Sequence, residues 1–195
     1  MSKAALTRSD ILGKAFTLIY QKGYQATSID EIIARTKVTK GAFFHHFSNK
    51  EEMGLAVIDE IMYPGLLPYM KNALNRTGDI RVNLYTMMED LLLHNSFFKV
   101  EYGCPAVNMI EEMAPLNRSF KKGLAGIMKQ WHSAITTALM QAQEGKSLHG
   151  KFDAVQVATY IISGYAGIRN TGKLLGKRVY HDYLAEFKIY LDRLV

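Results

Sequence analysis

The residues best suited to chemistry lie between Thr27 and Lys50, where hydroxyl, cationic and imidazole side chains are mixed with small residues. The run from Thr39 to Ala42 is small or hydrogen-bonding, and aromatic residues and histidines follow it from Phe43 to His46. Such residues at a helix N-terminus let the backbone approach base edges in a DNA major groove, while apolar residues hold the helix to its own domain. The pattern indicates hydrogen bonding to nucleic acid.

Two short helices joined by a tight turn must position these residues. Ser28 and Glu31 have the spacing of a capping box, in which each side chain satisfies a backbone amide at the helix start. Ile29, Ile32 and Ile33 then repeat at helical spacing. Because Thr39 can cap a second helix, the sequence predicts a helix-turn-helix over residues 28–47.

Helices on both sides must support this pair. Thr7 and Asp10 predict the start of a helix that ends at Gly23. Ser48 and Glu51 repeat the capping spacing and predict a further helix up to Pro64-Gly65. Lys50 falls in the first turn of that helix, where an ammonium group and unpaired amides can hold a phosphate.

A family resemblance rests on the run Val38-Thr39-Lys40-Gly41-Ala42-Phe43-Phe44-His45-His46-Phe47, followed by Lys50-Glu51. This run resembles the signature of the TetR-type transcriptional regulators, over about residues 5–65. The resemblance implies an all-α fold: an N-terminal three-helix DNA-binding module with a helix-turn-helix (residues 5–65), then a C-terminal helical bundle that binds an effector and dimerises (residues 66–195). Phe44 stands where the family has a tyrosine, which removes one hydroxyl that could donate to a phosphate.

The expected roles at a DNA operator follow from position in the helix pair. Residues at the N-terminus of the second helix should lie nearest the base edges, and flanking residues should hold phosphates. Phe44 should contact a sugar or a thymine methyl, and His46 can instead turn inward as a hydrogen-bonded core residue. The expected base-edge residues are Thr39, Lys40, Gly41 and Ala42, and the expected phosphate residues are Thr27, Ser28, His45, His46 and Lys50.

Charge supports a polyanionic partner. The formal net charge of the 195-residue chain is +6. A local basic excess favours nucleic acid through counterion release, although surface lysines can also serve solubility alone. The excess lies before position 51, where Lys3, Arg8, Lys14, Lys22, Arg35, Lys37, Lys40 and Lys50 face Asp10, Asp30 and Glu31.

Several classes of protein are disfavoured. One cysteine excludes an intrachain disulfide, and no secretion signal or apolar run of membrane-spanning length is present, so we expect a cytoplasmic protein without a membrane partner. No Walker loop, dinucleotide fingerprint or nucleophile elbow occurs, and the histidines lack metal-ligand spacing. We therefore expect no enzyme, cofactor or metal, and a helical enzyme remains the least favoured alternative. A DNA-binding regulator without an effector is the more favoured of the two alternatives.

From Leu66 onward the pattern is helical, with breaks at Gly78, Gly103 to Pro105, Pro115, Gly145 to Gly150 and Gly176. Two terminal segments, Ala154 to Leu174 and Val179 to Leu194, are unusually apolar for their place in the chain. Such surface must be covered by the bundle or by a second copy, and we expect a homodimer through these two helices.

An effector pocket is expected inside the bundle, for a small molecule whose identity the sequence does not give. Met-rich and aromatic walls adapt to varied ligands, but the same residues at helical spacing are also ordinary core. The candidate lining residues are Tyr85, Met88, Leu92, Phe97, Phe98, Cys104, Asn108, Met113, Trp131, Tyr160 and Tyr165. Glu111 or Glu112 could also face a pocket, but adjacent helical residues point about 100° apart, so at most one does.

Cys104 is a separate hypothesis. Pro105 suits the first position of a helix, which puts Cys104 at the N-cap, where unpaired amides and the helix dipole stabilise a thiolate. The run Gly103-Cys104-Pro105 resembles the Gly-Cys segment of a TetR subgroup that senses electrophiles and oxidants. By that resemblance, Lys173 or Lys177 would approach the sulfur. The alternative is an inert, buried structural thiol.

Overall fold

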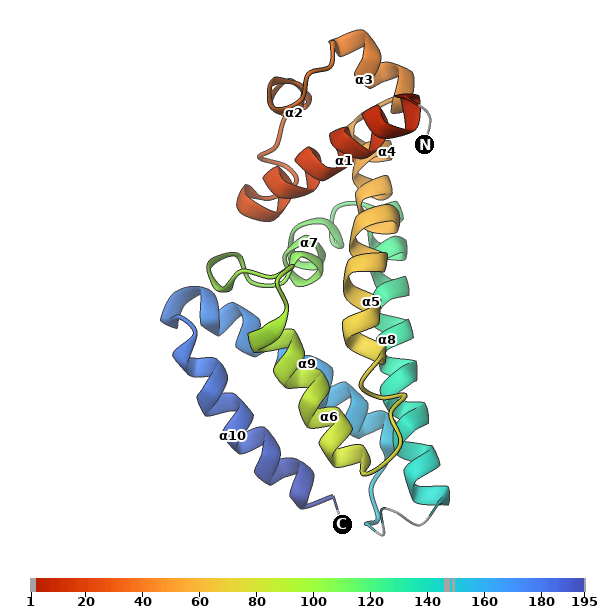
Figure 1. The fold of residues 1–195 in the computed structure, drawn as a ribbon, viewed down its shortest axis with the longest axis vertical. Coiled ribbons are helices and arrows are strands. Elements are labelled where there is room, and N and C mark those ends of the chain that lie inside the picture. The colour runs from red at the N-terminus through yellow and green to blue at the C-terminus, as the bar shows by residue number, and fades with distance from the viewer. Residues whose placement is uncertain (1–2, 146–147, 149, 195) are drawn as a thin grey trace. The chain divides into compact units, whose positions relative to one another are not determined.

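The computed structural model describes residues 3–145, 148 and 150–194 (Figure 1). Every regular element in that part of the chain is helical, which confirms the expected all-α fold. The chain divides into two compact units: a first unit of Met1–Pro64 with Pro105–Ala125, and a second unit of Gly65–Cys104 with Gly126–Val195. The division after Pro64 lies next to the boundary expected from sequence, but the assignment of Pro105–Ala125 to the first unit was not anticipated.

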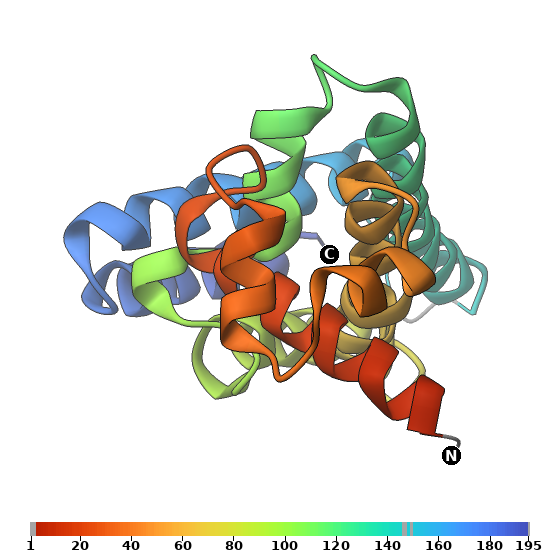
Figure 2. The same cartoon turned by 90° about the horizontal axis from the view of Figure 1, so that it is seen from above.

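The first unit begins with four helices: α1 (Lys3–Lys22), α2 (Ile29–Arg35), α3 (Lys40–His46) and α4 (Lys50–Val57). α1 begins at Lys3, before the start that was expected at Thr7. Figures 1 and 2 show the three N-terminal helices, red to orange, gathered into one module. Gly23 ends α1 at φ +95°, a conformation that favours glycine. The module is held together by an apolar core of Ile11, Ala15, Ile32, Phe43 and Phe47, each buried.

Two details of α4 differ from the expectation. Asn49, not Ser48, is the N-cap: its Oδ1 accepts from Glu52 N at 2.8 Å, and the Glu52 carboxylate accepts from Ser48 N. In addition, the chain does not leave the helix at Pro64. A π-helical turn (Ile58–Met62) leads directly into α5 (Tyr63–Lys71), and its altered hydrogen-bond register accommodates a proline that has no N–H.

The first unit is completed by α7 (Pro105–Met113) and the start of α8 (Arg118–Glu144). Gly54 shows how closely the start of α8 packs on α4. A Cβ at Gly54 would lie 2.6 Å from both the Phe120 and the Tyr24 rings, so only hydrogen fits there. Phe120 and Tyr24 also contact each other, with ring centroids 4.7 Å apart. Phe120, from the Pro105–Ala125 segment, therefore belongs to the core of the first unit.

The second unit contains α6 (Ile80–Glu89), which continues as a π-helical turn (Asp90–His94), then a 3₁₀ turn (Val100–Tyr102), most of α8, α9 (Ala154–Leu175) and α10 (Arg178–Asp192). α10 packs against both α6 and α9 (Figure 1). The apolar residues that repeat at helical spacing along α8 are buried throughout, at Phe120, Leu124, Ile127, Trp131, Ile135 and Leu139. α6 likewise buries Leu84, Met87 and Met88.

Glycines set the spacing of α9 and α10. A Cβ at Gly164 would lie 2.4 Å from the Tyr183 hydroxyl, and one at Gly172 would lie 2.4 Å from the Tyr180 ring. Gly167 has open space beside it. The two helices therefore approach closely at Gly164 and Gly172, and not at Gly167.

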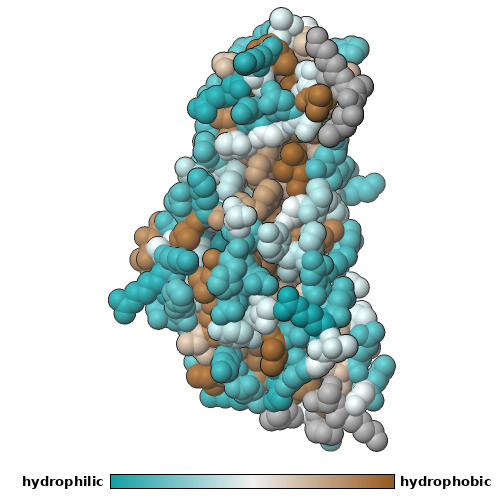
Figure 3. Space-filling model, viewed as in Figure 1, coloured by the Kyte–Doolittle hydropathy of each residue, from teal (hydrophilic) through white to brown (hydrophobic). Residues whose placement is uncertain are grey.

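The surface is mixed. On the face drawn in Figure 3, polar residues predominate and apolar residues emerge in separate small groups. No helix in the described part of the chain is long and apolar enough to span a membrane. The large apolar side chains that are exposed on α9 and α10 are Val155, Tyr160, Leu174, Leu175 and Ile189.

Candidate nucleic-acid interface

α2 starts with the predicted capping box. Ser28 Oγ accepts from Glu31 N at 3.1 Å, and Glu31 Oε2 accepts from Ser28 N at 2.8 Å. The Lys22 ammonium also donates to Glu31. This bond, followed by those from Ser28, lowers the pKa of Glu31 to about 2. The carboxylate therefore stays ionised at neutral pH and complements the positive end of α2.

α3 presents its N-terminus to solvent. Thr39 is the N-cap, and its Oγ1 accepts from Ala42 N at 3.2 Å, as expected from its position. Thr39, Lys40 and Gly41 are exposed. Behind them Phe43 and Phe47, at most 1% exposed, fix the helix to the module. A short helix with an anchored base and a small, polar, exposed start is suited to entering a major groove.

The remaining α3 residues differ in exposure. Phe44 is 45% exposed and packs edge-to-face on Phe43, with ring centroids 5.4 Å apart. His45 is exposed, whereas His46 is half-buried with its ring 6.4 Å from that of Phe47. Lys40 Nζ donates to Asp30 Oδ1 at 3.0 Å, and both side chains are well exposed. Such a surface pair is weak, so Lys40 can exchange Asp30 for an acceptor on DNA.

Two expected phosphate residues lie differently from the others. Thr27 is fully buried, and its hydroxyl donates to the Gly23 carbonyl at 2.8 Å, so it holds the turn after α1 and does not present its hydroxyl. Lys50 Nζ donates to the Gln25 carbonyl at 3.2 Å and lies 4.4 Å from the centroid of the Tyr24 ring. Burial lowers the pKa of Lys50. Both residues therefore brace the turn that leads into α2.

Sequence reasoning missed two supports of this interface. Glu112 on α7 accepts from Tyr24 N at 2.8 Å and from Gln25 N at 2.7 Å, so one carboxylate holds the whole turn. It had been considered only as a pocket residue, and no local signal in the sequence links it to a position 88 residues earlier. Arg8 on α1 lies 4.9 Å from the Phe47 ring centroid and pairs with Glu60, which braces the end of α3.

The expected pocket residues fall in both units. Asn108 and Met113 belong to α7 in the first unit. Within the second unit Met88, Leu92, Phe98, Cys104, Trp131 and Tyr165 are buried, Tyr85 and Phe97 are half-buried, and Tyr160 is 57% exposed. Trp131 donates to the Met87 sulfur at 3.3 Å and packs edge-to-face on Tyr165, so it is a core residue in this structure. Tyr160 instead contacts Tyr190 of α10, with ring centroids 4.6 Å apart and the rings tilted by 37°.

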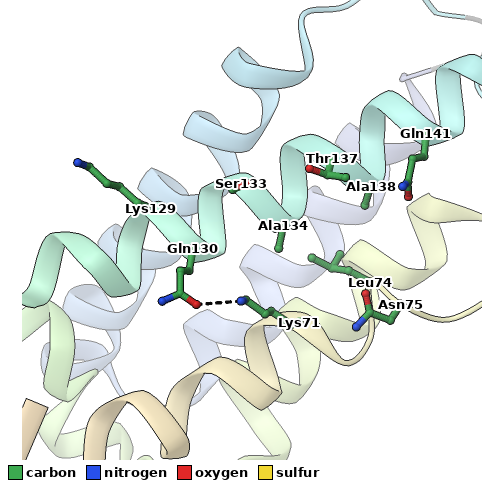
Figure 4. Close-up of a pocket in the computed structure, with 10 residues that line it drawn as sticks. All are labelled: Lys71, Leu74, Asn75, Lys129, Gln130, Ser133, Ala134, Thr137, Ala138 and Gln141. Carbon is green, nitrogen blue, oxygen red and sulfur yellow. Dashed lines mark hydrogen bonds between the residues drawn. The ribbon is translucent and has the colours of Figure 1, made fainter. Parts of the chain in front are cut away.

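Grooves in the second unit are lined mainly by other residues. One of about 450 Å³ lies between α8 and the end of α5, where Lys71 Nζ donates to Gln130 Oε1 at 3.0 Å (Figure 4). Lys129 points away from it (Figure 4). A second, of about 350 Å³, lies between α8 and α9 and includes His132 and Ile162. A third, of about 290 Å³, is bordered by Tyr85 and by Lys188 of α10.

Cys104 lies immediately before α7, whose first residue is Pro105, as the sequence predicted. The thiol is fully buried. Gly103 has φ +70°, and a Cβ there would lie 2.2 Å from Lys173 Cε and 3.3 Å from Lys173 Nζ. The Lys173 side chain therefore lies directly on the residue before the cysteine, whereas Lys177 is exposed at the start of α10. In the described residues, no group of three or more His, Cys, Asp or Glu side chains could hold a metal ion.

The capped helix-turn-helix of the first unit and the helical bundle of the second define a DNA-binding transcriptional regulator with a separate C-terminal domain. Two family models match the chain: "Bacterial regulatory proteins, tetR family" over residues 11–57, and "Tetracyclin repressor-like, C-terminal domain" over residues 83–187. The second match covers more than half of the chain. The protein belongs to the TetR family of transcriptional regulators.

Individual proteins agree with this assignment. An uncharacterized HTH-type transcriptional regulator in the lacX 3′ region of Lactococcus lactis subsp. lactis is 32% identical over 133 residues, 68% of each chain. The transcriptional regulator AcuR of Cereibacter sphaeroides is 27% identical over 176 residues, 88% of this chain and 78% of AcuR. The crystal structure of a TetR transcriptional regulator from Chloroflexus aurantiacus superposes with a TM-score of 0.89 over 100% of this chain and 98% of that one, at 21% identity, and so supports the fold.

Proposed function

We propose that the protein is a homodimeric repressor that binds a palindromic operator in the bacterial cytoplasm and leaves it when the second unit takes up an effector. The observation that carries this proposal is the exposed, capped N-terminus of α3 on its buried Phe43–Phe47 base. Two such helices, related by a two-fold axis, enter successive major grooves about one helical turn apart. Occupancy of a promoter then blocks transcription.

The proposed contacts follow the exposure of each side chain. Thr39, Lys40, Gly41 and Ala42 read base edges; Ser28, His45 and His46 hold phosphates; Phe44 packs on a sugar or a thymine methyl. Thr27 is left out because its hydroxyl is buried and already donates to Gly23. Lys50 contributes to phosphate binding by exchanging the Gln25 carbonyl for a phosphate oxygen, a stronger, charge-assisted acceptor.

The experiment compares DNA from upstream of the protein's own gene with a scrambled duplex, across a salt series. We expect specific retention of the upstream DNA. Lys40→Ala should mainly relax base preference, while Lys50→Ala should weaken binding to every sequence and reduce the salt slope by about 1. Lys14→Ala, an exposed lysine of α1, is the matched control. Equal behaviour of the Lys40 and Lys50 variants would refute the division of roles, and turnover of a substrate without DNA retention would favour an enzyme.

The dimer is proposed to form through α9 and α10. The support is the apolar surface that these helices expose, in particular Val155, Tyr160 and Ile189. Covering the same patch on two copies makes a self-complementary four-helix interface. Tyr160→Arg should therefore yield a monomer in light scattering and reduce operator affinity, whereas Met140→Arg, at an exposed apolar residue of α8, should leave the dimer intact. A dimeric Tyr160→Arg protein would contradict the assignment.

A thiol-reactive mode of release is proposed for Cys104 with Lys173. The contact of the Lys173 side chain with Gly103 supports it, because an ammonium near the sulfur stabilises the thiolate that reacts. The thiolate adds across the double bond of a maleimide, forms one C–S bond and leaves the carbon to take up a proton. Because the thiol is buried, we expect reaction to be slow and to follow local opening. Operator release by N-ethylmaleimide should be lost in Cys104→Ser, while equal release of both proteins excludes this role.

A further inference from the structure

Arg169 on α9 is 1% exposed, which makes it a charged side chain enclosed by the core of the second unit. A guanidinium group stays protonated at every physiological pH, so it cannot escape burial by losing its proton. Taking such a charge out of water is expensive unless an opposite charge or a full set of hydrogen-bond acceptors replaces the water. The groups around Arg169 must therefore compensate for the loss of water around its charge.

Three aromatic rings lie close to the guanidinium. Its Cζ lies 4.6 Å from the centroid of Phe98, 5.5 Å from that of Tyr180 and 6.0 Å from that of Tyr165. Cation–π contacts of this kind stabilise the charge. They do not accept from the N–H groups, which point outward within the plane.

The edges of the guanidinium are only partly satisfied. Nη2 donates to the Gly103 carbonyl at 2.7 Å. Nε is buried and has no acceptor among the described residues. In the described part of the second unit, no carboxylate lies within ion-pair distance of Arg169. The cation thus has aromatic neighbours, the Gly103 carbonyl and the Tyr180 hydroxyl as polar partners, and no carboxylate among the described residues as a counter-charge.

The neighbouring Tyr180 hydroxyl does not supply that charge. Burial raises the pKa of Tyr180, and the opposing influence of Arg169 does not reverse the rise. The hydroxyl therefore stays neutral at physiological pH. Among the described residues, neither this hydroxyl nor a carboxylate supplies a negative charge to Arg169.

We propose that Arg169 anchors an effector site for a small organic carboxylate, enclosed by Phe98, Tyr165 and Tyr180. Nε–H and an Nη–H point the same way from one edge of the planar group, at the spacing of two carboxylate oxygens. The apolar part of the ligand packs on the aromatic rings. A carboxylate is favoured over a phosphate because it is planar and carries a single charge, which costs less to bury.

This site also indicates how binding reaches the DNA, a step that rests on the proposed function. A carboxylate on the guanidinium fork competes with the Gly103 carbonyl. Gly103 is two residues before Pro105, the first residue of α7, and α7 carries Glu112, which holds the turn before α2. Freeing Gly103 therefore alters the restraint on a helix that positions the DNA-binding module.

The direct test is thermal unfolding of the purified dimer, without DNA. Sodium benzoate and sodium butyrate are compared with benzamide and butyramide, and with sodium chloride, sulfate and phosphate at matched ionic strength. We expect a concentration-dependent rise in Tm with the carboxylates that the amides and chloride do not produce. Arg169→Met should abolish this rise and leave the Tm of the ligand-free protein unchanged or higher, because it removes an uncompensated buried charge. Arg178→Met, at an exposed arginine of α10, should respond like the parent.

Each other outcome overturns the proposal. Equal shifts in the parent and Arg169→Met proteins, equal stabilisation by amides, or no shift with either carboxylate would assign Arg169 a structural role. A shift with phosphate or sulfate alone would replace the carboxylate with a different anion. If Arg169→Met does not fold, Arg169→Lys keeps the charge without the planar fork and should show a smaller carboxylate shift. Operator binding by the ligand-free parent tests the repressor function separately, so the two failures are distinguishable.

Discussion

The two units of this protein differ in where they place positively charged side chains. In the first unit Lys40 pairs with Asp30 at the surface, where the side chains keep 64% and 77% of their exposure. In the second unit Arg169 is 1% exposed and faces aromatic rings. A solvated pair is weak and exchanges readily for phosphates or bases, which suits reversible and salt-dependent DNA binding. A guanidinium that is buried among aromatic rings, such as that of Arg169, is instead suited to binding one anion of matching shape.

The two regions also differ in how their residues are positioned. Ser28 and Thr39 are placed by caps that span three residues of sequence. Arg169 meets a carbonyl 66 residues away and a ring from a third segment. Substitutions at the caps of the first unit should therefore have small effects on stability. Substitutions around Arg169 in the second unit should have larger effects, because they disturb contacts between several segments.

The largest effect is expected from Trp131→Ala. Trp131 is fully buried, so its loss leaves a cavity and should cost about 3–5 kcal/mol of unfolding free energy. Phe44→Ala in the first unit, at 45% exposure, should cost only about 0.5 kcal/mol but weaken operator binding. Urea denaturation at one fixed dimer concentration measures both. A Trp131→Ala loss below about 1 kcal/mol would contradict the packed core that the comparison requires.

A smaller loss of unfolding free energy is expected from Gly54→Ala, which compares a packed glycine with an open one inside the first unit. The added Cβ would lie 2.6 Å from the Phe120 and Tyr24 rings, so overpacking should cost about 1–3 kcal/mol. Gly13→Ala, in open space within α1, should stabilise the protein by about 0.5–1 kcal/mol. Thermal denaturation distinguishes them, and similar effects of the two variants would show that Phe120 of α8 and Tyr24 do not pack closely on α4.

The contrast explains how far the sequence could predict the molecule. Caps, helical stripes and helix breaks are local patterns, so the helix pair, the Pro105 start of α7 and the buried stripe of α8 could be predicted. Thr27 was assigned to DNA because its type and position suited a phosphate, but a turn bond to Gly23 uses its hydroxyl. That bond spans only four residues, but the residue types alone do not show which of the two acceptors the hydroxyl takes.

Arg169 and Glu112 show two kinds of missed residue. Arg169 stands four residues after Tyr165 on the apolar stripe of α9, so a charge on a core face was a signal available in the sequence. Glu112 gave no such signal, because its partners are backbone amides 87 and 88 residues away. Only the folded structure brings that carboxylate to the turn.

A third prediction concerns the cap of α3. Thr39→Ala removes the acceptor for Ala42 N and should cost about 1 kcal/mol of stability. Thr39→Ser keeps the hydroxyl and should retain most of it. Chemical denaturation of the two variants provides the comparison, and equal losses would mean that the methyl group, not the cap, stabilises this helix.

The smallest effect is a pH dependence at Glu31. Because the Lys22 and Ser28 bonds lower its pKa to about 2, the stabilising contribution is complete above the unfolded value of about 4.5 and is lost as pH falls through the folded value. The stability difference between the parent and Glu31→Gln proteins should therefore shrink between about pH 4.5 and pH 2. Denaturation at several pH values measures it; a constant difference would show that Glu31 is not ionised preferentially in the folded state.

The central claim is that Lys40 recognises DNA at the surface and that Arg169 binds the effector in the core. The most direct test is the fluorescence anisotropy of labelled operator DNA with the Lys40→Ala and Arg169→Met proteins, measured with and without benzoate. We expect Lys40→Ala to lose operator preference over scrambled DNA while its Tm still rises with benzoate. Arg169→Met, which also frees the Gly103 carbonyl, should bind the operator more weakly than the parent protein, and benzoate should not change that affinity. If benzoate still changes the operator affinity of Arg169→Met, or no longer raises the Tm of Lys40→Ala, the separation of reading and sensing between the two units is wrong.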